Sequence, residues 1–186
     1  GIPLPDVHVR IVDADKGETE LATGAVGEIV IRGLQVMRGY FHNPGESSAM
    51  LVKHPDGHTW LHTGDLGYLD EDGYLFIVDR KKDLIKAGGM QVWPRELEET
   101  LAKHPAVAEV GVRGFADAAK GEIAVAFVVL RQGLPATEHE LRDYCKQHLA
   151  FFKVPARVVF RSELAKSMIG KVLRRELKLD PSERKK

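Results

Sequence analysis

The chain has 186 residues, of which 44% are hydrophobic and 29% are charged, a composition typical of one ordinary globular domain or of two small ones. Its 27 basic residues balance 27 acidic residues, so the net charge favours neither a nucleic-acid nor a membrane partner. The single cysteine, Cys145, excludes an internal disulfide framework and fits a reducing compartment such as the cytoplasm. No apolar run reaches the roughly 18–20 residues of a transmembrane segment, and no signal peptide opens the chain.

The first part of the chain is predicted to be a small all-β unit. Alternating or glycine-bounded apolar segments predict strands, and the Asp-Glu-Asp-Gly sequence at 70–73 is a strong hairpin signal between the last two of them. A helical turn is expected at 47–53. The predicted strands are 7–12, 27–33, 66–69 and 74–78.

Three histidines in this part, His54, His58 and His62, are spaced four residues apart. On a helix they would share one face and could bind a metal. The sequence Pro-Asp-Gly at 55–57 breaks any helix there, so we interpret them as surface loop residues and expect no metal site.

The pattern changes at the charged run Asp79-Arg80-Lys81-Lys82-Asp83. We interpret it as the boundary between a β-rich subdomain, 1–80, and a compact α+β domain, 81–186. The second part is predicted to have the order β-β-α-β-β-α-β-α, so the fold class of the chain is α+β.

Three helices are expected in the second part. Pro94 is well placed as the first residue of one. Thr137 and Glu140 form a capping box before a second, whose buried face is Leu141, Tyr144, Cys145 and Leu149. Leu173 and Leu177, four residues apart, predict a last helix at 171–179. The expected strands are 84–85, 91–92, 107–115, 123–130 and 158–160, with 123–130 as a central strand because it is almost continuously apolar.

Several residues of these segments are candidates for chemistry. The carboxylate of Asp65, in a predicted Thr63-Gly64-Asp65 turn, can accept two hydroxyl donors of a ribose, although it could instead organise its own turn. The cations from Arg80 to Lys82 form either a solvated linker or a hinge that meets phosphate.

The remaining candidates lie after the boundary. Lys86, between Ile85 and Ala87, either extends from a strand to solvent or is held for catalysis. Gly88-Gly89 allows close approach of a backbone, or is a plain tight turn. Lys171 follows Gly170 at a predicted helix N-terminus, where a cation is unfavourable, and a lysine on a loop is a recurrent device for holding phosphate or carboxylate. It is not a Walker A lysine, because Ala165 occupies the position of the required upstream glycine.

In order and approximate spacing, these motifs resemble the adenylate-forming ligases: acyl-CoA synthetases, aryl-CoA ligases, luciferases and peptide-synthetase adenylation domains. The resemblance covers nearly the whole chain, and the segments after Asp79 and Gly170 look most like those of medium- and long-chain fatty acyl-CoA synthetases. The motifs are Gly27-Glu-Ile-Val-Ile-Arg-Gly33 with Gly39-Tyr40, Thr63-Gly64-Asp65, Asp79-Arg80-Lys81-Lys82-Asp83, Gly88-Gly89 and Gly170-Lys171.

The resemblance implies a reaction in two steps: a carboxylate and ATP give an acyl-adenylate and pyrophosphate, and after a domain rotation coenzyme A (CoA) displaces AMP. By the same resemblance, Asp65 would bind the ribose hydroxyls and Arg80 would contact the nucleotide, and Lys82 would be the hinge. Lys171 would serve adenylation, and Lys86 would approach the adenylate after rotation. The CoA passage would be lined by Gly88 and Gly89.

The resemblance also implies what this sequence lacks. The family's phosphate loop and acyl pocket, which supply most contacts to Mg²⁺ and triphosphate, lie upstream, so the chain is expected to be a C-terminal fragment that is inactive alone. It also departs from the family at Ala165, where proline is usual. Its expected partners are fatty acid, ATP, CoA and the upstream large domain of the parent chain, and peripheral membrane association stays open.

Two alternatives remain. The chain could belong to an aryl-CoA ligase, peptide-synthetase or luciferase-like branch. It could also be a non-catalytic interaction module, with its contact surface at 161–186, where nine Lys/Arg outnumber four Asp/Glu. The simplest interpretation of that charge is a solvated helix face and tail.

Overall fold

The computed structural model describes residues 1–180, 182 and 183, and the end of the basic tail lies outside these residues. The chain divides into two compact units, Gly1–Lys82 (unit 1) and Asp83–Lys186 (unit 2). Unit 1 is rich in β-strands, and unit 2 contains both helices and strands. The α+β class predicted from the sequence is confirmed.

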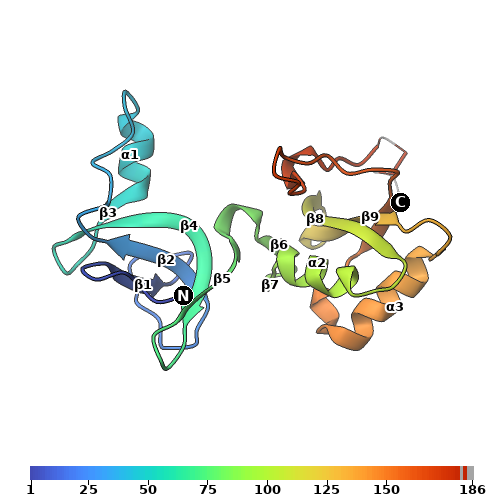
Figure 1. The fold of residues 1–186 in the computed structure, drawn as a ribbon, viewed down its shortest axis with the longest axis horizontal. Helices are drawn as coiled ribbons and strands as arrows, with labels where there is room; N and C mark the ends of the chain where they lie inside the picture. Colours follow the sequence, from blue (N-terminus) through green and yellow to red (C-terminus); the bar gives the residue numbers. More distant parts are fainter. Residues whose placement is uncertain (181, 184–186) are drawn as a thin grey trace. The chain divides into compact units, whose positions relative to one another are not determined.

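Unit 1 is built on an antiparallel sheet with the order β1-β2-β4-β3, in which β5 also pairs with β4 (Figure 1). Its buried core includes Val12, Val30 and Trp60. The hairpin predicted at 70–73 is present, since Asp70 N donates to Tyr74 O at 3.0 Å. The elements are β1 His8–Val12, β2 Gly27–Arg32, α1 Pro44–Met50, β3 Leu51–Lys53, β4 Thr59–Leu69 and β5 Leu75–Arg80.

The helical turn predicted at 47–53 is correct only in its first half. The α1 helix begins earlier, at Pro44, because the Asn43 side chain accepts a hydrogen bond from Glu46 N. Residues Leu51–Lys53 are instead a strand, since they pair with β4.

Unit 2 contains a sheet with the order β10-β9-β6-β7, in which β8 also pairs with β9. The β10–β9 pair is parallel, and the pairs β6–β7, β6–β9 and β8–β9 are antiparallel. A 3₁₀ turn, Lys81–Asp83, spans the boundary between the units. The elements are β6 Ile85–Ala87, β7 Met90–Val92, α2 Pro94–Ala102, β8 Val107–Asp117, β9 Gly121–Leu130, α3 Glu138–His148 and β10 Arg157–Phe160, with 3₁₀ turns at Phe151–Lys153 and Arg174–Glu176.

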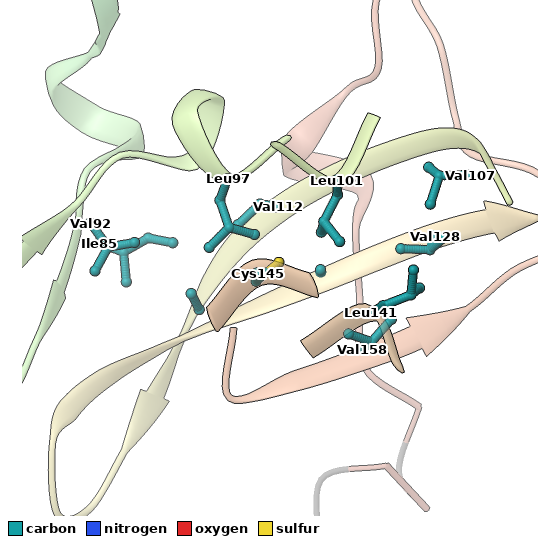
Figure 2. Packing of buried hydrophobic residues seen from close by; sticks show 12 residues of the cluster. Ile85, Val92, Leu97, Leu101, Val107, Val112, Val128, Leu141, Cys145 and Val158 are labelled. Carbon is teal, nitrogen blue, oxygen red and sulfur yellow. The ribbon is translucent and has the colours of Figure 1, made fainter. Parts of the chain in front are cut away.

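The β9 strand is central, as its apolar run predicts, because both of its faces are buried. Ala124, Ala126 and Val128 face one cluster, which α2 and α3 cover with Leu97, Leu101, Leu141 and Cys145 (Figure 2). Val125 and Phe127 face a second cluster. Alternating side chains of one strand therefore support two cores.

The second face of this sheet is covered by the C-terminal segment. Leu164, Leu177 and Leu179 pack against Val125 and Phe127, and Figure 1 shows this segment (red) and α3 on opposite sides of β8 and β9. Most of the segment is irregular, so the helix predicted at 171–179 is wrong apart from the 3₁₀ turn Arg174–Glu176.

Long-range hydrogen bonds explain why that helix does not form. The backbone N–H of Leu173 donates to Ala165 O at 2.8 Å. The guanidinium of Arg113 donates to the carbonyls of Arg175 and Leu177, each at 2.8 Å. Leu177 is buried against Val125 and Phe127, so its four-residue spacing from Leu173 does not reflect a helical repeat. No helix in the described part of the chain is long and apolar enough to cross a membrane.

Candidate functional site

A turn was predicted at Thr63-Gly64-Asp65, and this prediction is wrong. These residues form an irregular stretch within β4. The register between β2 and β4 shifts between Glu28 and Val30, opposite this stretch. Thr63 Oγ1 donates to Ile29 O at 2.7 Å and accepts from Asp65 N at 3.1 Å. Gly64 adopts φ +70°, which other residues rarely do. A bulge of this kind redirects a side chain, and here it presents Asp65.

Asp65 and Arg80 are brought together, as the candidate site requires. They are direct partners in the β4–β5 ladder, and Arg80 Nε lies 3.0 Å from Asp65 Oδ1. The side chains are 28% and 56% exposed respectively, so both are accessible to a ligand. The contact uses Oδ1, and Oδ2 is available to a hydroxyl donor.

A buried polar cluster around Glu28 contacts this stretch through Gly64, and the sequence did not predict it. Glu28 is 2% exposed, and its carboxylate accepts from Lys81 Nζ at 2.7 Å and from Gly64 N at 3.3 Å. It also lies 3.1 Å from His62 Nδ1. Burial raises the pKa of Glu28, but the hydrogen bonds from His62 and Lys81 outweigh it, and the net shift is downward. The available signal was a glutamate inside an otherwise apolar strand.

The histidines are placed differently from the sequence-based interpretation. His54 and His62 are buried, at 4% and 7% exposure, and only His58 is exposed. The Nε2 atoms of His54 and His62 lie 3.0 Å apart. Burial and the neighbouring His62 lower the pKa of His54. No group of three His, Cys, Asp or Glu side chains suited to a metal occurs among the described residues.

In unit 2, Lys86, Gly88 and Gly89 lie on one hairpin. β6 and β7 pair around the two glycines, whose φ values of +59° and +80° match the two-residue turn that favours glycine. A Cβ atom built on either glycine would meet nothing within 4 Å. The surface there is therefore open to another group. The side chain of Lys86 is exposed, and its backbone N–H donates to Glu122 Oε2 at 2.8 Å.

Lys171 lies on a separate hairpin in the C-terminal segment. An isolated bridge joins Lys166 to Val172, and Ser167 N donates to Lys171 O at 2.8 Å. Gly170 turns the chain with φ +79°. The lysine is exposed beside Met168 and Ile169, which are also exposed, so the hairpin presents an ammonium group at its tip. Lys82 lies in the 3₁₀ turn at the boundary of the units.

Comparison with known proteins identifies both units. Residues 96–171 match the AMP-binding enzyme C-terminal domain, and residues 1–41 match the AMP-binding enzyme family. The long-chain-fatty-acid–CoA ligase of Bacillus subtilis (strain 168) is 46% identical over 95% of this chain and 30% of its own length. A 4-coumarate–CoA ligase-like protein of Oryza sativa is 43% identical over 95% of this chain and 31% of its own length.

Solved structures of adenylate-forming enzymes are also similar to this chain. The o-succinylbenzoate-CoA synthetase of Bacillus subtilis, in complex with its acyl-adenylate intermediate, superposes with a TM-score of 0.83 at 39% identity, over 97% of this chain and 35% of that one. ATP-bound MatB of Rhodopseudomonas palustris gives a TM-score of 0.84 at 36% identity, over 92% of this chain and 33% of that one. The chain spans about 30% of the length of the curated relatives it matches. It belongs to the AMP-binding, adenylate-forming ligase family and corresponds to the part of those enzymes that includes the C-terminal domain.

Proposed function

We propose that this chain is the C-terminal part of an ATP-dependent fatty acid–CoA ligase. The observation that carries the proposal is the Asp65–Arg80 pair, held at 3.0 Å across the β4–β5 ladder, within motifs that resemble those of the family in sequence and order. The 46% identity to a long-chain-fatty-acid–CoA ligase supports the fatty acid as the substrate class.

In the proposed first step, an oxygen of the substrate carboxylate bonds to the α-phosphorus of ATP and pyrophosphate leaves. Asp65 accepts hydrogen bonds from the ribose hydroxyls, and Arg80 contacts the nucleotide beside it. The ammonium of Lys171 offsets the negative charge that develops on the acid and phosphate oxygens. By the resemblance to the family, Mg²⁺ would be bound mainly by the rest of the longer protein.

In the proposed second step, the thiol of CoA attacks the acyl carbonyl carbon, and AMP leaves with the electron pair of the broken bond. Unit 1 is the last subdomain of the adenylating domain, and unit 2 is the small domain that rotates about Lys82. Rotation replaces Lys171 by Lys86 at the adenylate. The open Gly88-Gly89 turn admits the pantetheine arm, because neither glycine carries a side chain to block it.

Activity requires the longer protein, and the chain alone is not expected to form a thioester. The test is AMP release by a longer protein that contains this chain, with ATP and Mg²⁺ and with short-, medium- and long-chain and aromatic acids, each with and without CoA. CoA-dependent release that peaks on fatty acids supports the proposal. Release that depends on no acid contradicts it.

A second candidate is a ligase of another branch, favoured by the likeness to a 4-coumarate–CoA ligase-like protein and to an amide bond synthetase of Marinactinospora thermotolerans. Acid-dependent pyrophosphate exchange that CoA does not advance would assign the protein to such a branch. A non-catalytic interaction module would bind polyanions weakly and in a salt-sensitive way, without any dependence on Asp65.

A further inference from the structure

The segment that carries Lys171 has little regular secondary structure, yet several ionic contacts hold it to the rest of unit 2. Before Lys171, Lys166 Nζ lies 2.5 Å from Glu109 Oε1 in β8. After it, the guanidinium of Arg113 binds two carbonyls of the same segment. Between these contacts lies Arg174, which the family motifs assign to no step.

Arg174 connects three parts of unit 2. Its Nε and Nη2 atoms form a bidentate pair with Glu98 of α2, at 2.9 and 2.6 Å. Its Nη1 atom lies 3.1 Å from Oδ2 of Asp83. The Arg174 and Glu98 side chains are each 19% exposed and that of Asp83 is 28% exposed, so solvent screens these bonds only in part.

Glu98 is fixed in turn. Its Oε1 atom accepts a hydrogen bond from Val112 N in β8 at 2.8 Å. The carboxylate to which Arg174 binds is therefore anchored to both a helix and the sheet. Glu98 is therefore a fixed partner for Arg174. A bidentate pair with a carboxylate fixes both the orientation of the guanidinium and its distance from the carboxylate.

We propose that Arg174 is a positioning residue that fixes the Lys171 hairpin to Asp83, the first residue after the boundary at Lys82. Arg174 lies three positions after Lys171, a reach of at most about 11 Å even in an extended chain. Displacement of Arg174 therefore displaces the ammonium of Lys171.

The contact with Asp83 has a second consequence. Asp83 directly follows Lys82 and is held to unit 2 by Arg174. A change in the backbone dihedrals of Lys82 then moves unit 2 as a body that includes Asp83. Arg174 thus confines the pivot to Lys82 and carries the Lys171 hairpin with it. The catalytic part of this inference rests on the proposed function, and the structural part does not.

The structural part is tested on the 186-residue chain by amide hydrogen exchange with Arg174→Met. Exchange at 167–172 and at 82–85 should accelerate about tenfold or more, while the core strand β9 changes little. The matched control is Arg175→Met, because the Arg175 side chain is 80% exposed and pairs only weakly, at 3.4 Å, with Glu176. Arg175→Met should leave both segments within about twofold of the original rates.

Asp83→Ala removes the contact of Arg174 with position 83 and leaves its pair with Glu98, so it tests the same link while disturbing the fold less than Arg174→Met. It should accelerate exchange at 82–85 and, more weakly, at 167–172. The inference is overturned if Arg174→Met behaves like Arg175→Met. It is also overturned if exchange accelerates uniformly through unit 2, which would indicate a purely structural role.

The catalytic part is tested in a longer protein that adenylates acids. Arg174→Met should lower acid-dependent pyrophosphate exchange about tenfold or more and leave thioester formation from supplied acyl-adenylate within about threefold. In a Lys171→Ala background it should have no further effect, because both changes remove the same contribution. The catalytic part would be overturned if Arg174→Met lowered both half-reactions equally. It would also be overturned if the effects of Arg174→Met and Lys171→Ala were fully additive. If the unaltered protein adenylates no acid, the proposed function fails, and the exchange measurements still decide the positioning claim.

Discussion

Replacement of Glu28 by glutamine should destabilise unit 1 by about 2 kcal/mol, because it removes a buried charge that several donors share. The Lys81 side chain is 41% exposed, so solvent screening limits its bond to at most about 1 kcal/mol. The His62 side chain is only 10% exposed, and a bond from it to a charged acceptor contributes about 1.5–3 kcal/mol. A glutamine oxygen can still accept from Gly64 N, so that bond is not lost.

The assay is urea unfolding of the 186-residue chain followed by tryptophan fluorescence. Trp60 is 1% exposed within unit 1, and a Trp93→Phe background removes the second tryptophan, so the signal reports unit 1 alone. The matched control is Glu20→Gln, whose parent side chain is 59% exposed and pairs with Arg10 at 3.3 Å. The control should change the free energy of unfolding by less than about 0.5 kcal/mol.

The pH dependence of unfolding is a second test of the Glu28→Gln prediction. The folded-state pKa of Glu28 lies below its ordinary value of 4.5. The stability from its charge is therefore fully present above pH 4.5 and is lost as the pH falls through the lowered pKa. The difference between the original chain and Glu28→Gln should be constant near neutral pH and shrink only below pH 4.5. A Glu28→Gln variant as stable as Glu20→Gln at pH 7 would refute this reasoning.

Three further predictions concern other parts of the chain. Because the folded-state pKa of His54 lies below 6.5, unit 1 should lose stability as the pH falls below that value, and His54→Gln should flatten this dependence in urea unfolding. Gly111→Ala should cost unit 2 about 1–3 kcal/mol in urea unfolding followed by the fluorescence of Trp93, which lies in unit 2, because the new Cβ would lie 2.9 Å from Val172 Cγ1 and 3.0 Å from Leu177 Cδ1, whereas Ala108→Ser, exposed on the same strand, should be nearly neutral. Burial raises the pKa of the Cys145 thiol to about 11, so native chain should react with a thiol reagent only as fast as it opens, and rapid labelling at neutral pH would contradict its placement in the core.

Local sequence signals predicted most of the elements because each acts over a few residues. Pro94 begins α2, and Thr137 with Glu140 forms the expected capping box of α3. The almost continuous apolar run in β9 predicted a central strand, and the structure has a buried cluster on each of its faces. The motif order likewise predicted the family that the comparisons identify.

The errors fall where partners distant in sequence decide the structure. The 171–179 helix fails because the segment bonds to distant partners: Arg113, about 60 residues earlier in the sequence, binds the carbonyl of Arg175, which a helix would use, and that of Leu177. His62 is buried because β4 pairs with β2 and brings His62 to Glu28, 34 residues away, and His54 is buried beside it. The contacts of Arg174 with Glu98 and Asp83 span 76 and 91 residues. No periodicity or short motif contains such pairings.

The most direct test of the account separates the two half-reactions in a longer protein that contains this chain. Lys171→Ala should abolish most acid-dependent pyrophosphate exchange and retain thioester formation from supplied acyl-adenylate and CoA, whereas Lys86→Ala should show the reverse pattern. That crossed result would establish that the two exposed lysines of unit 2 serve successive steps. If both variants lose both half-reactions equally, or if neither loses any, the account of alternating lysines is wrong.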